Sequence, residues 1–465
     1  MIVTPETEAG LPPLTLADID EMERELQNAP DATVERFRRG FDQTISEAEL
    51  RALLARARAV LQRPDATLDA LEAERTLDAT LQAALPGEFD FPGRTPEIPI
   101  DPANYQFEPK RDALGWIIHA GPRFIPYRLH DIRKADFRWA DDYPSKFVYP
   151  ILGPISDPGR LVEITLFSDF GTGLYHSRYI ARHMIGLRPD YAIHLGDVYY
   201  AGTASEFQTQ FTSVLAPLLA TTRLFGLNSN HEMMSGGLYY FDFLDWKHAA
   251  GAALAGTRAP AQEQEGSYFC LRGPHHQLIA IDTDYHYEQL GNSRLSEARQ
   301  RDWLAARLEE GRAAGLTNIL LSANEPYEAG KNTFTALYTL DLADLIKSNL
   351  IDLWFWGNTH YCALFDRSPA TPFIGSCIGH GGFPYDRMKP EQTAGTPTGV
   401  RFLETAARFP DWTNVRLDRG NNGFVRMTLR PDGGVSLEYV DWMHATRHVA
   451  EVGRVAGGGV GFEED

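Results

Sequence analysis

The sequence predicts an α/β fold, a mixed-sheet sandwich flanked by helices, with a helical region at the N-terminus. From about residue 160, short apolar runs alternate with polar loops and helical stretches, which indicates layered strands and helices. Near the end of the chain, alternating residues over 424–442 flank Asp432-Gly433-Gly434, a sequence typical of a hairpin turn. The hairpin adds antiparallel strands, so we expect one mixed sheet or two sheets packed as a sandwich.

The first part of the chain has a different pattern. Residues 1–85 read as helices, because Ser46 and Glu49 have the spacing of a capping box and Asp65 is placed to begin a further helix that extends to Leu81. Residues 86–158 are rich in proline, acidic and aromatic residues, which predicts a connector that packs on the core. We expect the core domain over 159–445 and a C-terminal tail over 446–465.

Within the core domain, six apolar runs are predicted to be buried strands, and one long helical pattern lies between the fourth and the fifth run. The strands are expected at 161–167, 191–196, 223–228, 277–282, 318–323 and 351–357, and the helix within 293–315.

The composition and the first residues of the chain indicate where the protein is located and which partners it can bind. No run approaches the 18 apolar residues of a membrane span, and the first residues lack the basic start and apolar stretch of a secretory signal. Three cysteines cannot form a disulfide framework, so a reducing, cytoplasmic location is expected. The net charge of −19 disfavours nucleic acids and large polyanions as partners, but it is compatible with a small-molecule substrate. We expect no membrane partner, and the oligomeric state stays open.

Four polar clusters each follow one of the predicted strands. They are Asp169-Phe170-Gly171, Gly196 through Tyr200, Asn230-His231-Glu232, and Gly357 through His360. Carboxylate, phenol, amide and imidazole side chains at the carboxyl ends of neighbouring strands can converge on one crevice. A hydrolase with two metal ions needs a bridging carboxylate, further ligands and a proton donor for the leaving oxygen. The four clusters therefore predict a metal site.

The order and spacing of these clusters resemble the calcineurin-like metallophosphoesterases, and within them the purple acid phosphatases. Ser168-Asp169-Phe170-Gly171 corresponds to the first motif of that family, and Gly196 through Tyr200 matches the second motif in full. Ser229 through Glu232 corresponds to the third motif, and Gly357 through His360 to the fifth. The resemblance covers about residues 160–440 and implies a metallophosphoesterase fold.

The resemblance implies two metal sites. The first would be formed by Asp169, Tyr200, His360 and a bridging Asp197, and it would hold iron, because a phenolate with carboxylates suits a hard ferric ion. The second would be formed by Asp197, Asn230 and two histidines. At those two histidine positions this chain has Ala323 and Asn358 instead.

Three interpretations of the altered second site remain open. Oxygen donors from Asp197, Asn230 and Asn358, with Asn324 or Glu325, would hold a divalent Mn, Mg or Ca ion more readily than Zn. Alternatively, the second metal is absent and the site is mononuclear. In the third interpretation, the chain is a catalytically attenuated scaffold that binds a ligand.

The expected function is metal-dependent hydrolysis of a phosphate mono- or diester by a metal-bound hydroxide. The resemblance gives His231 the role of orienting the phosphoryl group or protonating the leaving oxygen, with Glu232 steering its ring and Asn230 beside it. A mononuclear iron enzyme with other chemistry is the alternative enzyme. His176 and His380, with Asn324 and Glu325, are further candidates for residues near the site.

Overall fold

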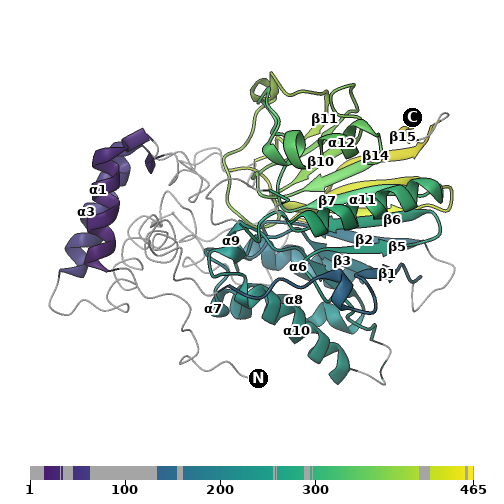
Figure 1. Cartoon of the computed structure of the whole chain (residues 1–465), viewed down its shortest axis with the longest axis horizontal. Helices are drawn as coiled ribbons and strands as arrows, with labels where there is room; N and C mark the ends of the chain where they lie inside the picture. The colour runs from purple at the N-terminus through teal and green to yellow at the C-terminus, as the bar shows by residue number, and fades with distance from the viewer. Residues whose placement is uncertain are drawn as a thin grey trace.

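The computed structural model of this chain describes residues 15–31, 33–34, 46–62, 134–153, 161–254, 257, 259–286, 294–295, 297–407, 419–455 and 459–463. Two β-sheets pack face to face and helices cover their outer surfaces (Figure 1). The predicted α/β class and the sandwich of mixed sheets are therefore confirmed. Each of the six predicted core strands coincides with an observed strand, within a few residues at its ends.

One sheet has seven strands in the order β15-β14-β13-β12-β2-β3-β4. Its parallel part comprises β2 (Val162–Phe167), β3 (Tyr191–His194) and β4 (Arg223–Gly226). Its antiparallel part comprises the predicted hairpin, β12 (Gly423–Leu429) and β13 (Val435–Asp441), together with β14 (Thr446–Arg454) and β15 (Val460–Phe462). The segment 446–465, expected as a tail, instead contributes two strands, which extend the hairpin edge.

The other sheet has eight strands in the order β1-β5-β6-β7-β8-β10-β9-β11. Four central strands run parallel: β6 (His276–Ile281), β7 (Thr317–Ser322), β8 (Leu353–Trp356) and β10 (Ile374–Ile378). The strands toward the edges are β1 (Val148–Pro150), β5 (Phe269–Arg272), β9 (Cys362–Phe365) and β11 (Val400–Leu403). Strand β1 lies in the segment predicted as a connector, so part of that segment belongs to the sheet.

The hydrophobic core lies between the sheets and beneath the helices. Ile164, Phe225 and Leu353 belong to the cluster between the two sheets. Helices α6 (Tyr175–Leu187) and α10 (Leu238–Ala253) pack on the outer face of the seven-stranded sheet. Helix α11 (Ala298–Ala313) lies within the predicted helical pattern, and it packs with α12 (Ala343–Lys347) on the eight-stranded sheet. No helix among these described segments combines the length and the hydropathy needed to cross a bilayer.

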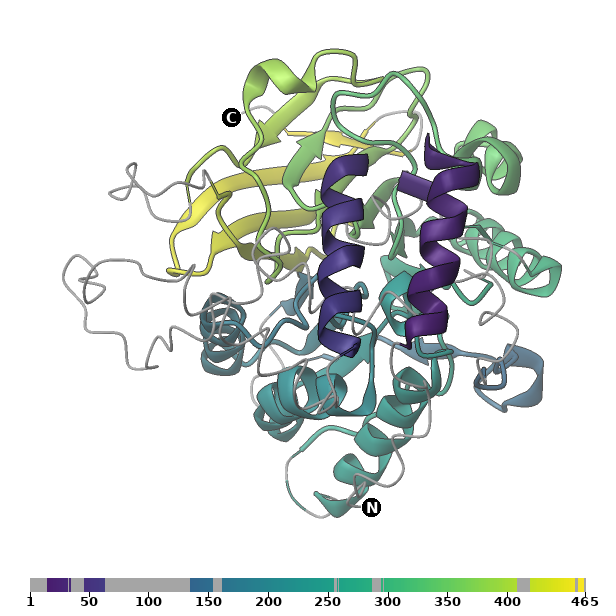
Figure 2. The same ribbon diagram turned by 90° about the vertical axis from the view of Figure 1, so that its left-hand side faces the viewer.

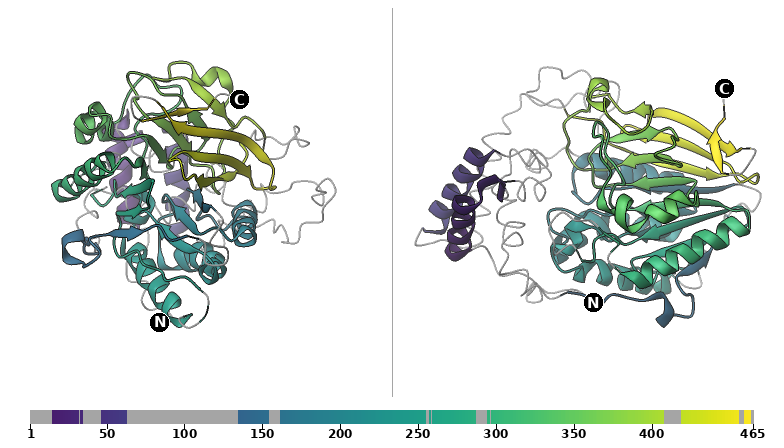
Figure 3. Two further views of the ribbon diagram at one scale, coloured as in Figure 1. Left: turned by 90° about the vertical axis from the view of Figure 1, so that its right-hand side faces the viewer. Right: turned by 45° about the horizontal axis from the view of Figure 1, so that its top comes forward.

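Two N-terminal helices, α1 (Leu16–Asn28) and α3 (Glu47–Leu61), form an antiparallel pair. The Arg58 guanidinium joins them by donating to Asp20 and Glu23 at 2.6 and 2.7 Å. Helix α3 begins directly after Ser46, as predicted, although the side chain of Glu49 lies outside the described residues. The predicted helix over 65–81 also lies outside them. In Figure 2 the pair lies in front of the sandwich, and the right-hand view of Figure 3 shows it set to one side.

A buried lysine joins α10 to the seven-stranded sheet. Lys247 has no solvent exposure, and its ammonium donates to the Leu224 carbonyl at 2.8 Å and to Gln264 Oε1 at 2.7 Å. Its burial lowers the pKa of this amine well below the ordinary value of 10.5, because the charged form loses its hydration.

We predict that Lys247→Met removes a pH dependence of stability. Between the depressed folded-state pKa and the unfolded-state value near 10.5, the unfolded chain binds the additional proton, so wild-type stability rises with pH. The slope from this one group reaches at most about 1.4 kcal/mol per pH unit. Urea unfolding at several pH values measures it. The variant should lack this contribution, whereas the exposed control Lys347→Met should keep it; parallel curves for wild type and Lys247→Met would refute the assignment.

Candidate metal centre

The candidate site lies where loops from both sheets meet. Asp169 follows β2, Asp197 follows β3, and Asn358 and His360 follow β8. Three of these residues have left-handed backbone angles, with φ of 56° at Asp169, 77° at Asp197 and 61° at Asn358. Aspartate and asparagine tolerate this region better than most residues do. The chain thus turns sharply at each strand end and brings the side chains into one buried cluster.

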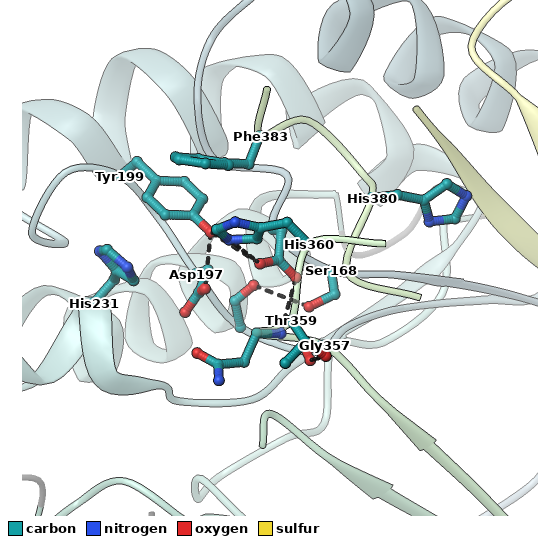
Figure 4. Close-up of polar contacts among 12 residues, drawn as sticks. Ser168, Asp197, Tyr199, His231, Gly357, Thr359, His360, His380 and Phe383 are labelled. Atoms are coloured by element: carbon teal, nitrogen blue, oxygen red, sulfur yellow. Dashed lines mark hydrogen bonds and ion pairs between the residues drawn. The ribbon is translucent and has the colours of Figure 1, made fainter. Parts of the chain in front are cut away.

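The phenol of Tyr199 is the centre of this cluster. Its hydroxyl oxygen lies 2.9 Å from Asp169 Oδ1, 2.9 Å from Asp197 Oδ2 and 2.9 Å from His360 Nε2. His360 Nε2 lies 3.1 Å from Asp169 Oδ1. Figure 4 shows the Tyr199 hydroxyl and the His360 ring turned toward each other, with Asp197 below them. The structure therefore brings together three of the predicted ligands, Asp169, Asp197 and His360, around a tyrosine that the motif did not select.

The donor set fits a metal ion. A phenol carries one proton, so it cannot donate to both carboxylates at once, and the remaining oxygen–oxygen contact is repulsive without a cation. Around an octahedral ion with bonds of about 2.1 Å, neighbouring donor atoms lie about 3.0 Å apart. The observed separations of 2.9–3.1 Å match that spacing. Ligand atoms of Asp169, Asp197 and His360 all lie within 4.8 Å of one another.

The electrostatics of Asp169 also suit a ligand role. Its burial raises the carboxyl pKa, but the hydrogen bond and charge of His360, with hydrogen bonds from Ser168 and Tyr199, outweigh burial and lower the pKa to about 2. Asn358 adds a backbone N–H bond to Asp169 Oδ2 at 3.1 Å. Asp169 is therefore an anionic donor at neutral pH.

The loop after Asp197 is held by a buried carboxylate. Glu206, in the short helix α7 (Ala204–Glu206), accepts the backbone N–H groups of Tyr200, Ala201 and Thr203, the last two at 3.1 and 2.8 Å. The carbonyl of Tyr200 in turn accepts from Nδ1 of His231 at 2.6 Å. The partner that fixes His231 Nδ1 is thus this carbonyl rather than the predicted Glu232. Tyr200 as a metal ligand remains a prediction.

Aromatic packing fixes the orientation of the imidazole and the phenol. The ring of His360 stacks on Phe383 with centroids 4.0 Å apart, and Tyr199 packs on the same Phe383 at 4.7 Å. The ring of His231 lies 4.4 Å from that of Tyr199. His176, at the start of α6, bonds through Nε2 to the Gly382 carbonyl, so it supports the loop that carries Phe383.

The other side of Asp197 differs from the first. Ser229 donates its hydroxyl to Asp197 Oδ1, and the same hydroxyl contacts Glu232 Oε2. Burial raises the pKa of Glu232 to about 7, against the lowering effect of its bond with Ser229. Asn230, in the short helix α9 (Asn230–Met233), has a buried Oδ1 without a hydrogen-bond partner. Asn358 donates from its amide to Glu325 Oε2 at 3.0 Å.

The remaining candidates have other surroundings. The Asn324 amide donates to Thr283 and Asp284, which places it in a neighbouring polar cluster after β6. Glu325 has a pKa raised to about 7, mainly by burial and then by the charge of Glu328. The buried His380 ring lies near the backbone of Gly423 in β12, and in Figure 4 it stands apart from the Tyr199 cluster.

Sequence reasoning missed four residues that build the site: Tyr199, Ser229, Glu206 and Phe383. Tyr199 stands directly beside the motif tyrosine, so its presence was a usable signal. Ser229 stands where the third motif has glycine, which was a second signal. Thr203 and Glu206 have the spacing of a capping box, which was a local signal for Glu206. Nothing local to Phe383 identifies it, because its contacts with Tyr199 and His360 arise only in the fold.

Part of this chain matches the model of a known protein family. Residues 162–362 match the model of the calcineurin-like phosphoesterases, which confirms the resemblance read from the motifs. The match supports a metal-dependent phosphoesterase at the level of the family. A search of curated proteins finds no match.

Solved structures show only distant likeness. The Plasmodium protein GAP50, described as the anchor in the inner membrane complex, is 11% identical with a TM-score of 0.46, over 66% of this chain and 90% of that one. The yellow lupin purple acid phosphatase PPD1 is 17% identical with a TM-score of 0.45, over 65% and 54%. A dimetal phosphatase from Danio rerio is 11% identical with a TM-score of 0.37, over 60% and 96%.

We predict that Glu206→Gln loosens the loop that carries Tyr199. A glutamine offers one acceptor oxygen where the carboxylate offers two, so at least one buried N–H loses its partner, at a cost of about 1–3 kcal/mol in unfolding free energy. Metal affinity should fall about 10-fold or more, because the loop orients a ligand. Chemical denaturation and competition with a chelator measure both. The control Glu47→Gln breaks only an exposed pair with Arg51 and should change neither quantity much; equal effects of the two variants would contradict the proposed role of Glu206.

Proposed function

We propose that this chain hydrolyses small phosphate mono- or diesters with a metal ion held by Asp169, Asp197, His360 and Tyr199, because residues 162–362 match the model of the calcineurin-like phosphoesterases. The observation that carries the proposal is the Tyr199 hydroxyl, 2.9 Å from donor atoms of all three other residues. The net charge of −19 favours a small substrate over a polyanionic one.

We further propose that the ion is ferric iron. Two carboxylates and a phenolate are hard anionic donors, and with one imidazole they suit a small, highly charged cation. When bound, such an ion supplies a Lewis acid that offsets charge on phosphoryl oxygens and lowers the pKa of water. All four side chains are largely buried, which excludes bulk water and strengthens each electrostatic contact.

In this proposal, His231 is the general acid that donates a proton to the leaving oxygen. Its Nδ1 is committed to the Tyr200 carbonyl at 2.6 Å, which requires the proton on Nδ1 and makes Nε2 the nitrogen that exchanges a proton with substrate. The buried, unpartnered Oδ1 of Asn230 supplies a fixed polar group on the same helix, with a role in orienting the substrate.

A second candidate function is iron chemistry other than phosphate hydrolysis. The specific observation that favours it is the loss of both imidazoles from one side of the site, where Ala323 and Asn358 stand. That loss removes part of the positive charge that would stabilise a phosphoryl transition state. Iron-loaded protein without turnover of generic aryl phosphates would select this alternative.

We predict that Tyr199, rather than Tyr200, gives the metal site its colour. A phenolate bound to ferric iron absorbs visible light by charge transfer, so the iron-loaded protein should be coloured and Tyr199→Phe should abolish the band. The neighbouring Tyr200→Phe is the matched control and should keep the band. A visible absorption spectrum with parallel iron analysis measures this. Loss of the band in Tyr200→Phe alone would return the ligand role to the motif tyrosine.

We also predict that His231→Ala lowers kcat by about 10²–10⁴-fold, the range typical of general acid–base groups, with metal content unchanged. The loss should be smaller for an aryl phosphate with an acidic leaving group, because that group departs without a proton. Steady-state kinetics on two aryl phosphates of different leaving-group pKa measure the difference. Exposed His275 provides the control, His275→Ala. An equal loss on both substrates would exclude the proton-donor role.

A further inference from the structure

We infer that Ser229 and Glu232 close the second side of Asp197, so that this chain holds a single metal ion where its family relatives hold two. The inference rests on the proposed function, because it assumes that the cluster around Tyr199 binds a metal. It deepens that proposal by fixing the number of ions and the residues that set it.

The two oxygens of Asp197 have different surroundings. Oδ2 faces the Tyr199 hydroxyl at 2.9 Å and belongs to the candidate metal centre. Oδ1 accepts the hydroxyl of Ser229, and that hydroxyl oxygen accepts the backbone N–H of Asp197 itself at 3.0 Å. A carboxylate that bridges two ions through both of its oxygens offers one oxygen to each ion. In this chain, the oxygen that would face the second ion is engaged by a side chain.

Ser229 is held in this position by a second contact. Its hydroxyl also meets Glu232 Oε2, and that oxygen accepts the Asp197 N–H at 3.3 Å. Ser229, Glu232 and Asp197 are each 0–1% exposed. The three side chains therefore form a closed, buried hydrogen-bonded group. A second ion that displaced the Ser229 hydroxyl from Asp197 Oδ1 would break that group, and each buried bond lost costs about 1–3 kcal/mol.

The wall beside this group offers no replacement ligand. A Cβ placed on Gly196 would lie 2.6 Å from Ser229 Cβ and 3.3 Å from Ala323 Cβ, so both side chains stand on the same side of the Asp197 loop. The Ala323 methyl has no donor atom. Asn358, at the other altered position, uses its amide to bond Glu325 at 3.0 Å. Its backbone N–H is engaged by Asp169.

The acidic, histidine and cysteine side chains of the described residues also offer no second group of metal ligands. Across the described part of the chain, Asp169, Asp197 and His360 are the one group of three or more such residues with ligand atoms close enough together. A second site would have to rely on amides, which are weak neutral ligands. The chain therefore combines a complete site on one side of Asp197 with a hydrogen-bonded group on the other.

The test is metal stoichiometry, a measurement independent of turnover. Full-length protein is loaded with ferric iron, then titrated with Zn²⁺ in a calorimeter and analysed by mass spectrometry for metal content. We expect one iron per chain and no tight Zn²⁺ binding. Two tightly bound ions per wild-type chain would overturn the inference and leave the proposed function standing. No bound metal would overturn the proposed function itself.

Variants test whether Ser229, Ala323 and Asn358 set the number of bound metal ions. The combination Ser229→Gly, Ala323→His and Asn358→His frees Asp197 Oδ1 and restores two imidazoles, and it should bind one additional Zn²⁺ per chain. Ser229→Ala, which removes only the hydroxyl, should bind Zn²⁺ at least 10-fold more tightly than wild type. The control Ser376→Gly alters a buried serine in β10, outside the site, and should leave one ion. If the triple variant and Ser229→Ala both remain folded by circular dichroism and both remain at one ion, the inference is wrong.

Discussion

Two buried carboxylates that share one phenolic proton are the constraint on which the site depends. Asp169 and Asp197 come from neighbouring strands of one sheet, His360 follows a strand of the other, and the Tyr199 hydroxyl lies within 2.9 Å of all three. Negative charges this close in a buried setting repel strongly unless a cation lies between them. The same contacts that define the site therefore hold the two sheets together at this edge, and they make the local structure dependent on a bound positive charge.

Such a cluster persists because its surroundings leave it no other arrangement. Left-handed backbone at non-glycine residues costs about 1–3 kcal/mol each, and Asp169, Asp197 and Asn358 all adopt it. Two glycines permit the close approach of the loops from the two sheets: a side chain at Gly357 would collide with the Ser168 hydroxyl, and one at Gly381 with the Ser168 carbonyl. The fold thus stabilises a strained cluster through backbone contacts that larger residues would prevent.

The sequence predicted much of this structure because both the strands and the ligands follow local rules. Apolar runs at 161–167 and 351–357 form buried strands, and the polar residues after them converge, since parallel strands end at one edge. Spacing alone could not select Tyr199 as the phenol beside the two carboxylates, because it does not say which of two adjacent side chains turns toward them. Phe383 could not be identified because its partners Tyr199 and His360 lie in other segments. Strands β14 and β15 were missed because the segment 446–465 alternates weakly and pairs only with the hairpin already formed.

Tyr199 and Ser229 pose the same chemical problem on opposite sides of Asp197. Each hydroxyl has one proton and touches two carboxylates: Tyr199 touches Asp169 and Asp197, and Ser229 touches Asp197 and Glu232. On the Tyr199 side, an imidazole and the lowered carboxyl pKa of Asp169 favour a metal ion. On the Ser229 side, burial raises the pKa of Glu232 to about 7, so a carboxyl proton balances the charge without an ion. The negative charge of Asp197 is thus balanced by a metal ion on one side and by a carboxyl proton on the other. This difference is the physical basis for an asymmetric site.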